Sequence, residues 1–342
     1  MSARLTPEGG TTMRIGLVGT GFMGSIHARA WGRTPARLAG VVSTDAASRD
    51  AIAQAHGAAV YPTLADMLPH VDVVDICTPT HLHYEQVMAA LAAGRHVVCE
   101  KPLARHAAQA QEMVSAARAA GLWLLVGHVV RFFPEYAQAK AIVESGQIGD
   151  VAVTRLTRCS FKPARGTAES WFHDPAKSGG MMLDLMIHDF DYARWIAGDV
   201  VSVFARRVAR SFPQAAGDYA LAILTHASGA ISHVEGGWAY PPPMFRTALE
   251  IAGSAGLIEH PAASSVPLGI HLHESASASA DIAVPTSPLA RSPYEAQIDH
   301  FYDVLAGKEQ ALRVSAEDGY QALRIALAAI ESADTGRKVS LS

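Results

Sequence analysis

The sequence predicts an α/β protein of two domains, in which a parallel sheet covered by helices is followed by a largely antiparallel sheet. Up to Val126, short β-rich segments alternate with Ala-rich helical segments, and this alternation is typical of βαβ units. Beyond Gly127, several β-rich segments follow one another, which indicates antiparallel pairing. A length of 342 residues, 49% hydrophobic and 18% charged, is enough for two domains with sizeable cores.

The first domain is expected over residues 14–127, after a flexible tail at 1–13 that lacks the apolar segment of a signal peptide. Its β-rich segments predict strands at 14–18, 38–42, 71–77, 97–99 and 123–126. Its Ala-rich segments predict helices at 22–31, 48–56, 64–68, 84–93 and 107–120. Helices between the strands predict one parallel sheet with helices on both faces.

The second domain is expected over residues 128–342, although its final helix at 316–334 could pack back on the first domain. Five further strands are predicted at 151–157, 201–208, 219–225, 230–238 and 247–252. Helices are predicted at 135–145, 181–197, 294–306 and 316–334. The Ser/Ala/Pro-rich stretch at 261–293 predicts loops with short strands.

Composition excludes several classes of function. Lys and Arg total 28 and Asp and Glu total 32, so a formal net charge of −4 gives no electrostatic reason to bind nucleic acid or an anionic membrane. No apolar run reaches the length of a membrane helix. The three cysteines lack zinc-ligand spacing and suit a reducing compartment, which indicates a cytoplasmic protein. No metal motif is found among the histidines.

A glycine-rich turn follows the first strand directly and opens the first helix. It consists of Gly19, Thr20, Gly21, Phe22, Met23 and Gly24. The three glycines would permit a tight turn, a close approach of a pyrophosphate to the backbone, and close packing of the helix on the strand. The helix N-terminus would add N–H groups and partial positive charge. In a run of βαβ units, this pattern predicts a dinucleotide site.

The end of the second strand leaves the choice between NAD and NADP open. A carboxylate at this position would hold the ribose hydroxyls of NAD and repel the extra phosphate of NADP. Here the chain reads Ser43, Thr44, Asp45. If Ser43 occupies the position, two hydroxyls could accept a phosphate, with help from Arg49. If Asp45 reaches back, NAD is favoured.

Two further loops at strand ends carry unusual chemistry. One contains Thr78, Pro79, Thr80 and His83, and the other reads Cys99-Glu100-Lys101-Pro102. Ligands of such sheets bind at the carboxyl ends of the strands. A buried Lys101 beside a cofactor would need a role or a partner, because burying an ammonium group is costly. A surface pair of Glu100 with Lys101 before a proline is the alternative.

The segment at 181–197 is apolar nearly all round, which predicts a buried helix. Its main polar interruptions are Asp184, His188, Asp189 and Asp191. Asp184 and His188 are four residues apart and would lie on one face of that helix. One interpretation is a satisfied Asp–His pair in the core. The other is that this stripe lines a cleft, where Asp184 orients His188 as a proton carrier.

Together, these segments resemble the glucose–fructose oxidoreductase / inositol dehydrogenase (Gfo/Idh/MocA) family of NAD(P)-dependent oxidoreductases. The resemblance extends through most of the chain. Its motifs are Gly19-x-Gly21-x-x-Gly24, Thr78-Pro79-Thr80-x-x-His83, Ala90-Leu91-x-Ala93-Gly94-x-His96-Val97, Glu100-Lys101-Pro102 and Gly179-Gly180-x-x-Leu183-Asp184-x-x-x-His188-Asp189-x-Asp191. The segment from Met186 to Asp191 is most similar to the inositol dehydrogenase branch.

The resemblance implies a Rossmann domain, NAD or NADP as cofactor, and an α/β second domain whose open sheet face forms a homodimer or homotetramer. It implies that Lys101, Asp184 and His188 are catalytic and contact the substrate, and that Trp171 lies near the nicotinamide. Glu100, Lys101 and the strand-end residues named above would contact the cofactor. Arg131 is kept as a substrate contact, but Val129 and Val130 replace a pair that is often Asn-Arg. Further substrate contacts are expected from separated positions, such as His173 and Tyr240.

The expected reaction is hydride transfer between a secondary alcohol of a sugar or cyclitol and the nicotinamide ring, with a small polyol as partner and no nucleic acid or membrane. Two alternatives remain. The first is a non-catalytic sugar sensor on the same scaffold. The second is a dehydrogenase of amino-acid metabolism, which would leave the Asp184 and His188 segment unexplained.

Overall fold

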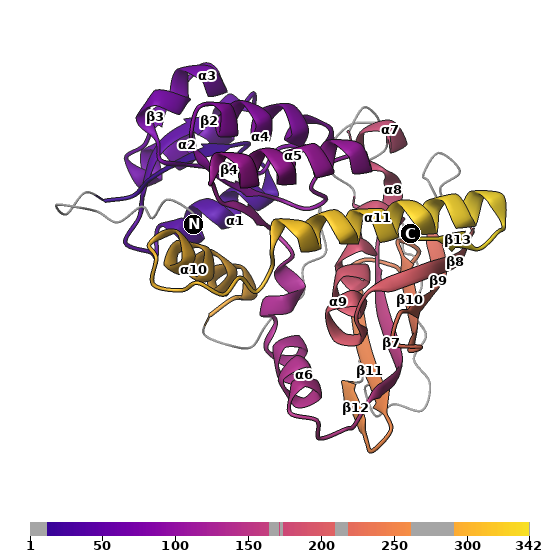
Figure 1. The fold of residues 1–342 in the computed structure, drawn as a ribbon. Helices are drawn as coiled ribbons and strands as arrows, with labels where there is room; N and C mark the ends of the chain where they lie inside the picture. Colours follow the sequence, from indigo (N-terminus) through magenta and orange to yellow (C-terminus); the bar gives the residue numbers. More distant parts are fainter. Residues whose placement is uncertain (1–11, 164–170, 172–173, 209–217, 261–290, 342) are drawn as a thin grey trace. The chain divides into compact units, whose positions relative to one another are not determined.

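The computed structural model describes residues 12–163, 171, 174–208, 218–260 and 291–341. The expected tail therefore lies almost wholly outside the described residues, as does most of the stretch at 261–293. The chain forms two compact units (Figure 1). Unit 1 comprises Met1–Phe132 and Pro288–Tyr320, and unit 2 comprises Phe133–Ser287 and Gln321–Ser342. Each unit is described by itself below.

Unit 1 contains a six-stranded parallel sheet, as the alternation of segments predicts. Its strands are β1 (Arg14–Val18), β2 (Arg37–Val42), β3 (Ala59–Val60), β4 (Val73–Ile76), β5 (His96–Cys99) and β6 (Leu124–Val126). They lie in the order β3-β2-β1-β4-β5-β6. The order reverses between β1 and β4, and such a reversal is where α/β sheets of this kind bind ligands. Strand β3 escaped prediction because its two residues are exposed and carry no periodic signal.

The helices of unit 1 begin and end at the residues that local signals indicate. They are α1 (Phe22–Trp31), α2 (Ala46–His56), α3 (Leu64–Met67), α4 (His83–Ala92), α5 (Ala107–Ala120) and α10 (Pro293–Leu305), with the 3₁₀ turns η1 (Leu68–His70), η2 (Thr80–Leu82) and η3 (Val129–Phe132). Helix α5 ends at Gly121, which adopts a left-handed conformation that costs other residues more. Helix α10 begins with a capping box of Ser292 and Glu295.

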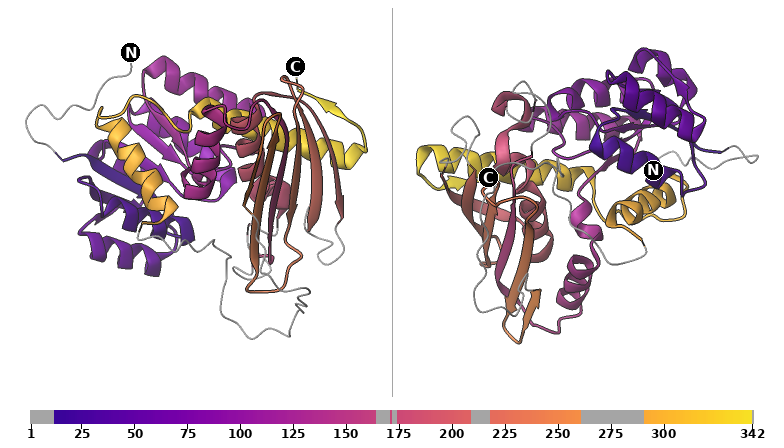
Figure 2. Two further views of the ribbon diagram at one scale, coloured as in Figure 1. Left: turned by 90° about the horizontal axis from the view of Figure 1, so that it is seen from below. Right: turned by 180° about the vertical axis from the view of Figure 1, so that it is seen from behind.

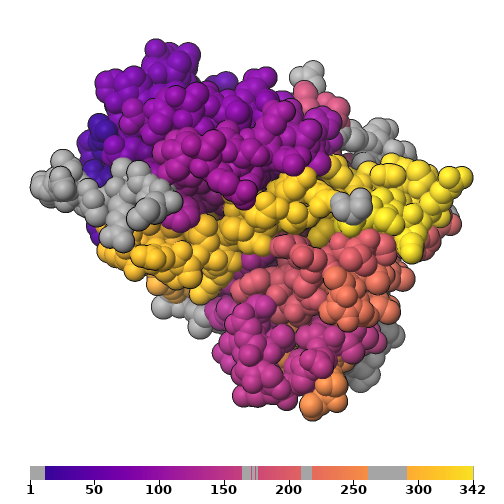
Figure 3. Space-filling model, in the orientation of Figure 1, coloured from indigo at the N-terminus to yellow at the C-terminus, as the bar shows by residue number. Residues whose placement is uncertain are grey.

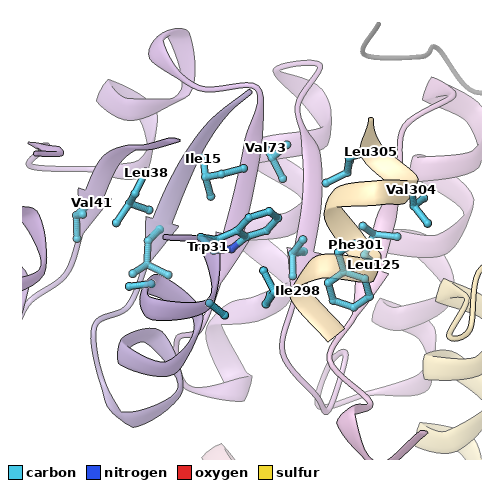
Figure 4. Close-up of a cluster of buried hydrophobic side chains, with 14 of the residues drawn as sticks. Ile15, Trp31, Leu38, Val41, Val73, Leu125, Ile298, Phe301, Val304 and Leu305 are labelled. Carbon is cyan, nitrogen blue, oxygen red and sulfur yellow. The ribbon is translucent and has the colours of Figure 1, made fainter. Parts of the chain in front are cut away.

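Helix α10 contributes to the hydrophobic core of unit 1, although it is far from the sheet in sequence. Ile298 and Phe301 are fully buried in one cluster with Trp31 of α1 and with β-strand residues such as Ile15 (Figure 4). In the space-filling view, gold atoms of α10 adjoin the atoms of unit 1 (Figure 3). The domain division thus differs from the expected one, because part of the chain beyond residue 128 completes the first unit.

Unit 2 contains a seven-stranded sheet that is antiparallel apart from one parallel pair, β7 with β10. Its strands are β7 (Val151–Ser160), β8 (Val200–Val208), β9 (Tyr219–His226), β10 (Ile231–Gly237), β11 (Phe245–Gly253), β12 (Leu257–His260) and β13 (Val339–Ser340). The largely antiparallel character predicted from the consecutive β-rich segments is confirmed. The two short edge strands, β12 and β13, were not predicted.

The helices of unit 2 are α6 (Pro134–Glu144), α7 (Pro175–Ser178), α8 (Gly180–Asp184), α9 (Ile187–Ala197) and most of α11 (Ala316–Thr335). Helix α11 is tied to the sheet, since Ser332 Oγ accepts the N–H of Ala205 in β8 at 2.9 Å. The strands lie side by side and α11 runs along one side of the sheet (Figures 1 and 2). Every helix in the described part of the chain is too short or too polar to span a membrane.

The single helix predicted at 181–197 is wrong, because the structure divides it into α8 and α9. The N–H groups of Leu185 and Met186 both donate to Met181 O, and those of Asp189 and Phe190 both donate to Met186 O. Packing explains the break. A Cβ at Gly236 of β10 would lie 2.3 Å from Met186 Cγ, so Met186 fits closely against a strand that offers no side chain.

One face of the second sheet exposes large apolar side chains at alternating positions. Phe204 of β8, Leu221 and Ile223 of β9, and Ile231 of β10 are each 37–45% exposed. Phe204 is paired with Ile223 across β8 and β9, so these side chains lie on one surface. The intervening residues, such as Ala222 and Val234, are fully buried on the other face.

Replacing Phe301 with Ala is expected to lower the free energy of unfolding by about 3–5 kcal/mol, since a fully buried ring would leave a cavity. Urea unfolding followed by circular dichroism would measure the loss. Asp303→Ala on the same helix is the control, because that side chain is 43% exposed and its ion pair with Lys308 is open to solvent. Equal losses for both variants would show that α10 is not part of this core.

Candidate functional site

The glycine-rich turn joins three strand ends of unit 1. Gly19 has a φ of +90°, and its N–H donates to Val42 O at the end of β2 at 2.8 Å. A Cβ on Gly19 would lie 2.8 Å from Cys77 O, which follows β4. A Cβ on Gly24 would lie 2.1 Å from Gly19 O. The turn therefore has room only for glycine at these two positions, as the dinucleotide interpretation requires.

The first turn of α1 presents its backbone to solvent at this point. Gly21 is the N-cap residue and is exposed, and the ten-residue helix has no side-chain cap. The first N–H groups of a helix have no partner within the helix and carry partial positive charge. This helix N-terminus has no side-chain cap and lies where the strand order of the parallel sheet reverses. Such a place fits the pyrophosphate of a dinucleotide.

The end of β2 carries a group of hydroxyls. Thr20 Oγ1 donates to Ser43 Oγ at 2.8 Å and lies 2.6 Å from Ser48 Oγ. The Asp45 carboxylate instead accepts the N–H groups of Ala47 and Ser48 and caps α2. These hydrogen bonds lower the pKa of Asp45. Ser43 directly follows β2, so a hydroxyl rather than a carboxylate occupies the strand end.

His83 connects the two loops that follow β4 and β5. Its ring nitrogens lie 2.9 Å from Thr78 O and 2.8 Å from Pro102 O, and the ring is buried. Burial lowers the pKa of His83, although the two carbonyl oxygens oppose that shift. The imidazole thus holds both loops in place, while its expected contact with the cofactor stays a prediction. Thr78 also hydrogen-bonds to Gln86, and Thr80 is buried.

The Glu100 carboxylate lies inside unit 1 and not on its surface. Glu100 is 6% exposed, its Oε2 accepts the N–H of Lys101 at 3.1 Å, and its Oε1 lies 3.2 Å from His27 Nε2. The alternative of a surface pair with Lys101 is therefore wrong for Glu100. Lys101 itself is half-buried at the carboxyl end of β5, and its bond to Pro102 is cis.

A buried polar cluster that the sequence analysis missed lies behind this loop. His27 of α1 and Asp75 of β4 are both fully buried, with Nδ1 and Oδ2 at 2.9 Å. Trp31 Nε1 donates to the same carboxylate at 2.7 Å, and Cys77 Sγ lies 3.3 Å from His27 Nδ1. The available signal was a charged residue within the apolar run of β4 and a histidine on the apolar side of α1.

In unit 2, Asp184 ends α8 and His188 is the second residue of α9. The expectation that they share one helix face is wrong because the helix is interrupted between them. They are nevertheless the half-buried positions in a segment whose other residues from Met181 to Ala193 are buried. Asp189 instead forms a buried pair with Arg158, in which Nε and Oδ2 lie 2.7 Å apart.

The remaining residues expected to contact the substrate or the nicotinamide lie in different environments. Arg131 is 2% exposed, and its Nη1 donates to Arg313 O at 2.8 Å and lies 3.3 Å from Asp318 Oδ2. This environment favours a structural role, and its substrate contact stays a prediction. Trp171 is half-buried in unit 2, whereas His173 lies outside the described residues. Tyr240 follows β10 and donates its N–H to Ser160 O.

Comparison with known proteins agrees with this arrangement. An oxidoreductase family with an NAD-binding Rossmann fold matches residues 13–128, and the GFO/IDH/MocA C-terminal domain matches 136–259. The uncharacterized oxidoreductase YrbE of Bacillus subtilis is 30% identical over 341 residues, which cover 95% of this chain and 96% of that protein. Inositol 2-dehydrogenase of Rhizobium meliloti is 29% identical over 342 residues, covering 97% and 100%.

A solved structure supports the same assignment. The crystal structure of GenD2 from gentamicin A biosynthesis, in complex with NAD, superposes with a TM-score of 0.84 at 25% identity, over 99% of each chain. The overall fold is therefore shared with that structure. The chain belongs to the Gfo/Idh/MocA family of oxidoreductases.

Proposed function

We propose that this protein is an NAD(P)-dependent dehydrogenase or reductase that acts on a secondary alcohol of a sugar or cyclitol. The observation that carries the proposal is the Glu100-Lys101 loop at the carboxyl end of β5, on the same sheet edge as the glycine-rich turn. Relatives named as reductases or dehydrogenases of 1,5-anhydro-D-fructose, inositol and levoglucosan support the substrate class.

The bound nicotinamide would supply the hydride acceptor for alcohol oxidation. Lys101 Nζ would hydrogen-bond the reacting oxygen and stabilise the negative charge that develops there. His188 would accept the hydroxyl proton, and Asp184 would orient the imidazole. Lys101 as the base is the nearest variant. The presence of all three residues argues against a non-catalytic sensor, and the Asp184 and His188 segment argues against amino-acid substrates.

Lys101→Met should lower kcat at least about a thousandfold, because the variant loses the donor to the reacting oxygen. The Kd for NADH or NADPH should stay within about twofold of the wild-type value, since the pyrophosphate site is untouched. Reduction of NAD(P) with a panel of polyols, aldoses and amino acids would measure kcat, and fluorescence titration would measure Kd. Lys101→Arg is the charge-preserving control. Normal turnover by Lys101→Met would end this assignment.

The hydroxyl group at the end of β2 supports NADP as an accepted cofactor. Ser43 and Thr20 offer hydroxyls, and the capping role of Asp45 uses its carboxylate on α2. Because position 43 carries a hydroxyl and not a carboxylate, a ribose phosphate would meet no negative charge from this side chain. Arg49 is near in sequence, but its Nε donates to Asp50 at 2.8 Å.

Ser43→Asp should therefore weaken NADP binding at least about tenfold relative to NAD, because a carboxylate would repel the 2′-phosphate and can bind the ribose hydroxyls. Isothermal titration with both cofactors would measure the ratio of dissociation constants. Ser43→Asn separates charge from size, since it is similar in volume and neutral. If both variants change the ratio equally, charge at position 43 does not decide the cofactor.

The exposed apolar face of the second sheet is proposed to bind a second copy of this chain. Phe204, Leu221, Ile223 and Ile231 form a patch on one face of the sheet, and monomeric proteins rarely expose large patches of this kind. A sheet face that repeats alternating side chains suits an isologous contact around a two-fold axis. The three free cysteines of the described chain support a cytoplasmic location.

Leu221→Lys should shift the protein toward the monomer. In the proposed dimer the patch of each copy would be buried, so each copy would bring an ammonium group into the interface. Sedimentation velocity at several protein concentrations would report the change. Val60→Lys is the matched control, since Val60 is an aliphatic residue of unit 1 that is 43% exposed outside this sheet. A wild-type protein that sediments as a monomer at micromolar concentration would exclude this interface.

A further inference from the structure

The buried cluster behind the Lys101 loop contains a histidine between two carboxylates. His27 is fully buried, with Nδ1 2.9 Å from Asp75 Oδ2 and Nε2 3.2 Å from Glu100 Oε1. The three residues come from α1, β4 and the loop after β5. None of them belongs to the set of residues proposed above to touch the reacting atoms.

His27 Nδ1 hydrogen-bonds to Asp75, and Nε2 lies within ion-pair distance of Glu100 Oε1 although that approach does not have hydrogen-bond geometry, so a proton on each ring nitrogen gives both carboxylates a favourable partner. A neutral imidazole carries one N–H and one lone pair, and a lone pair that faces a carboxylate oxygen is repelled. Burial lowers the pKa of His27, but the negative charge of Asp75 and its hydrogen bond oppose this, and the pKa is raised well above its usual value. An imidazolium therefore balances part of the negative charge of two buried carboxylates.

The Glu100 carboxylate connects His27 with the backbone of Lys101, the next residue. Its Oε1 faces His27, and its Oε2 accepts the N–H of Lys101 at 3.1 Å. Gly127, which follows β6, lies behind the carboxylate, since a Cβ there would be 2.7 Å from Oε1. The carboxylate is thus held between a cation, a backbone donor and a glycine that leaves space for it.

We propose that His27 is a positioning residue for the reaction. As an imidazolium anchored on Asp75, it fixes the Glu100 carboxylate and thereby the backbone at Lys101. This inference rests on the proposed role of Lys101. A displacement of about 1 Å in a reacting group can cost about a hundredfold in rate without loss of binding, so the predicted signature is a loss of kcat.

The same atoms have the residue types of a metal site, because ligand atoms of His27, Asp75 and Cys77 all lie within 4.8 Å of one another. The contacts favour a proton instead. Asp75 also accepts from Trp31, and burial raises the pKa of the Cys77 thiol, which disfavours the thiolate that binds metals. Metal analysis of the purified protein separates the two explanations.

The test compares two substitutions that both act at Glu100 Oε1. His27→Gln removes the charge, and Gly127→Ala pushes on Oε1 without touching His27. Each should lower kcat about 10- to 100-fold, with substrate KM and the Kd for reduced cofactor within about twofold. The double variant should lose less than the product of the two effects, because both act through one carboxylate.

Trp31→Phe is the matched control, because it removes one hydrogen bond to Asp75 Oδ2 but leaves His27 and Glu100 unsubstituted. It should lower the melting temperature with kcat unchanged. Nitrogen NMR of ¹⁵N-histidine-labelled protein should show both His27 ring nitrogens protonated at pH 8, with the signal assigned by its loss in His27→Gln.

Three results would overturn the proposal. The first is an unchanged kcat in both His27→Gln and Gly127→Ala. The second is a kcat that falls in all three variants only as far as the melting temperature falls. The third is stoichiometric metal in the protein purified without chelator. Lys101→Met measured in parallel keeps the outcomes apart. If that variant is inactive and His27→Gln is normal, only the positioning role fails. If Lys101→Met turns over normally, the proposed function of Lys101 fails first.

Discussion

A parallel sheet brings the carboxyl ends of all its strands to one edge, and the chemistry of unit 1 depends on this constraint. The turn after β1, the hydroxyls after β2, and the loops after β4 and β5 come from segments spread over some eighty residues of sequence. Contacts at the edge are tight, since Gly19 leaves no room for a Cβ against Cys77 O. Because the strands are hydrogen-bonded in register, each loop starts from a defined point.

Buried charges are the second theme of the molecule, and several of them form ion pairs. Arg158 and Asp189 join β7 to α9, and Arg131 is held by Asp318. An isolated buried charge is costly, and its ion pair must be well aligned to recover that cost. The pair of Arg158 with Asp189 meets this condition with two short contacts. The His27 cluster differs in that one of its members, Glu100, precedes the lysine to which we assign catalysis.

Predictions from the sequence succeeded where a signal is local and failed where packing decides. The βαβ alternation, the glycine-rich turn and the consecutive strands of unit 2 were readable because they follow from hydrophobic period and turn residues. The break between α8 and α9 was not readable, since it depends on Met186 filling the space above Gly236. The place of α10 in the core of unit 1 depends on contacts with α1 across more than 250 residues of chain.

By itself, the sequence determined the fold class and the dinucleotide turn, because these depend on residue types at fixed spacings, whereas the residues proposed for catalysis stay a prediction from the family resemblance. Only the tertiary structure decided how Glu100 is used, that Asp45 caps a helix, and that Arg131 is committed to internal contacts. It also revealed His27 and Asp75 as partners. Such pairings join residues distant in the chain, and no local pattern encodes them, since each depends on which strands and helices become neighbours.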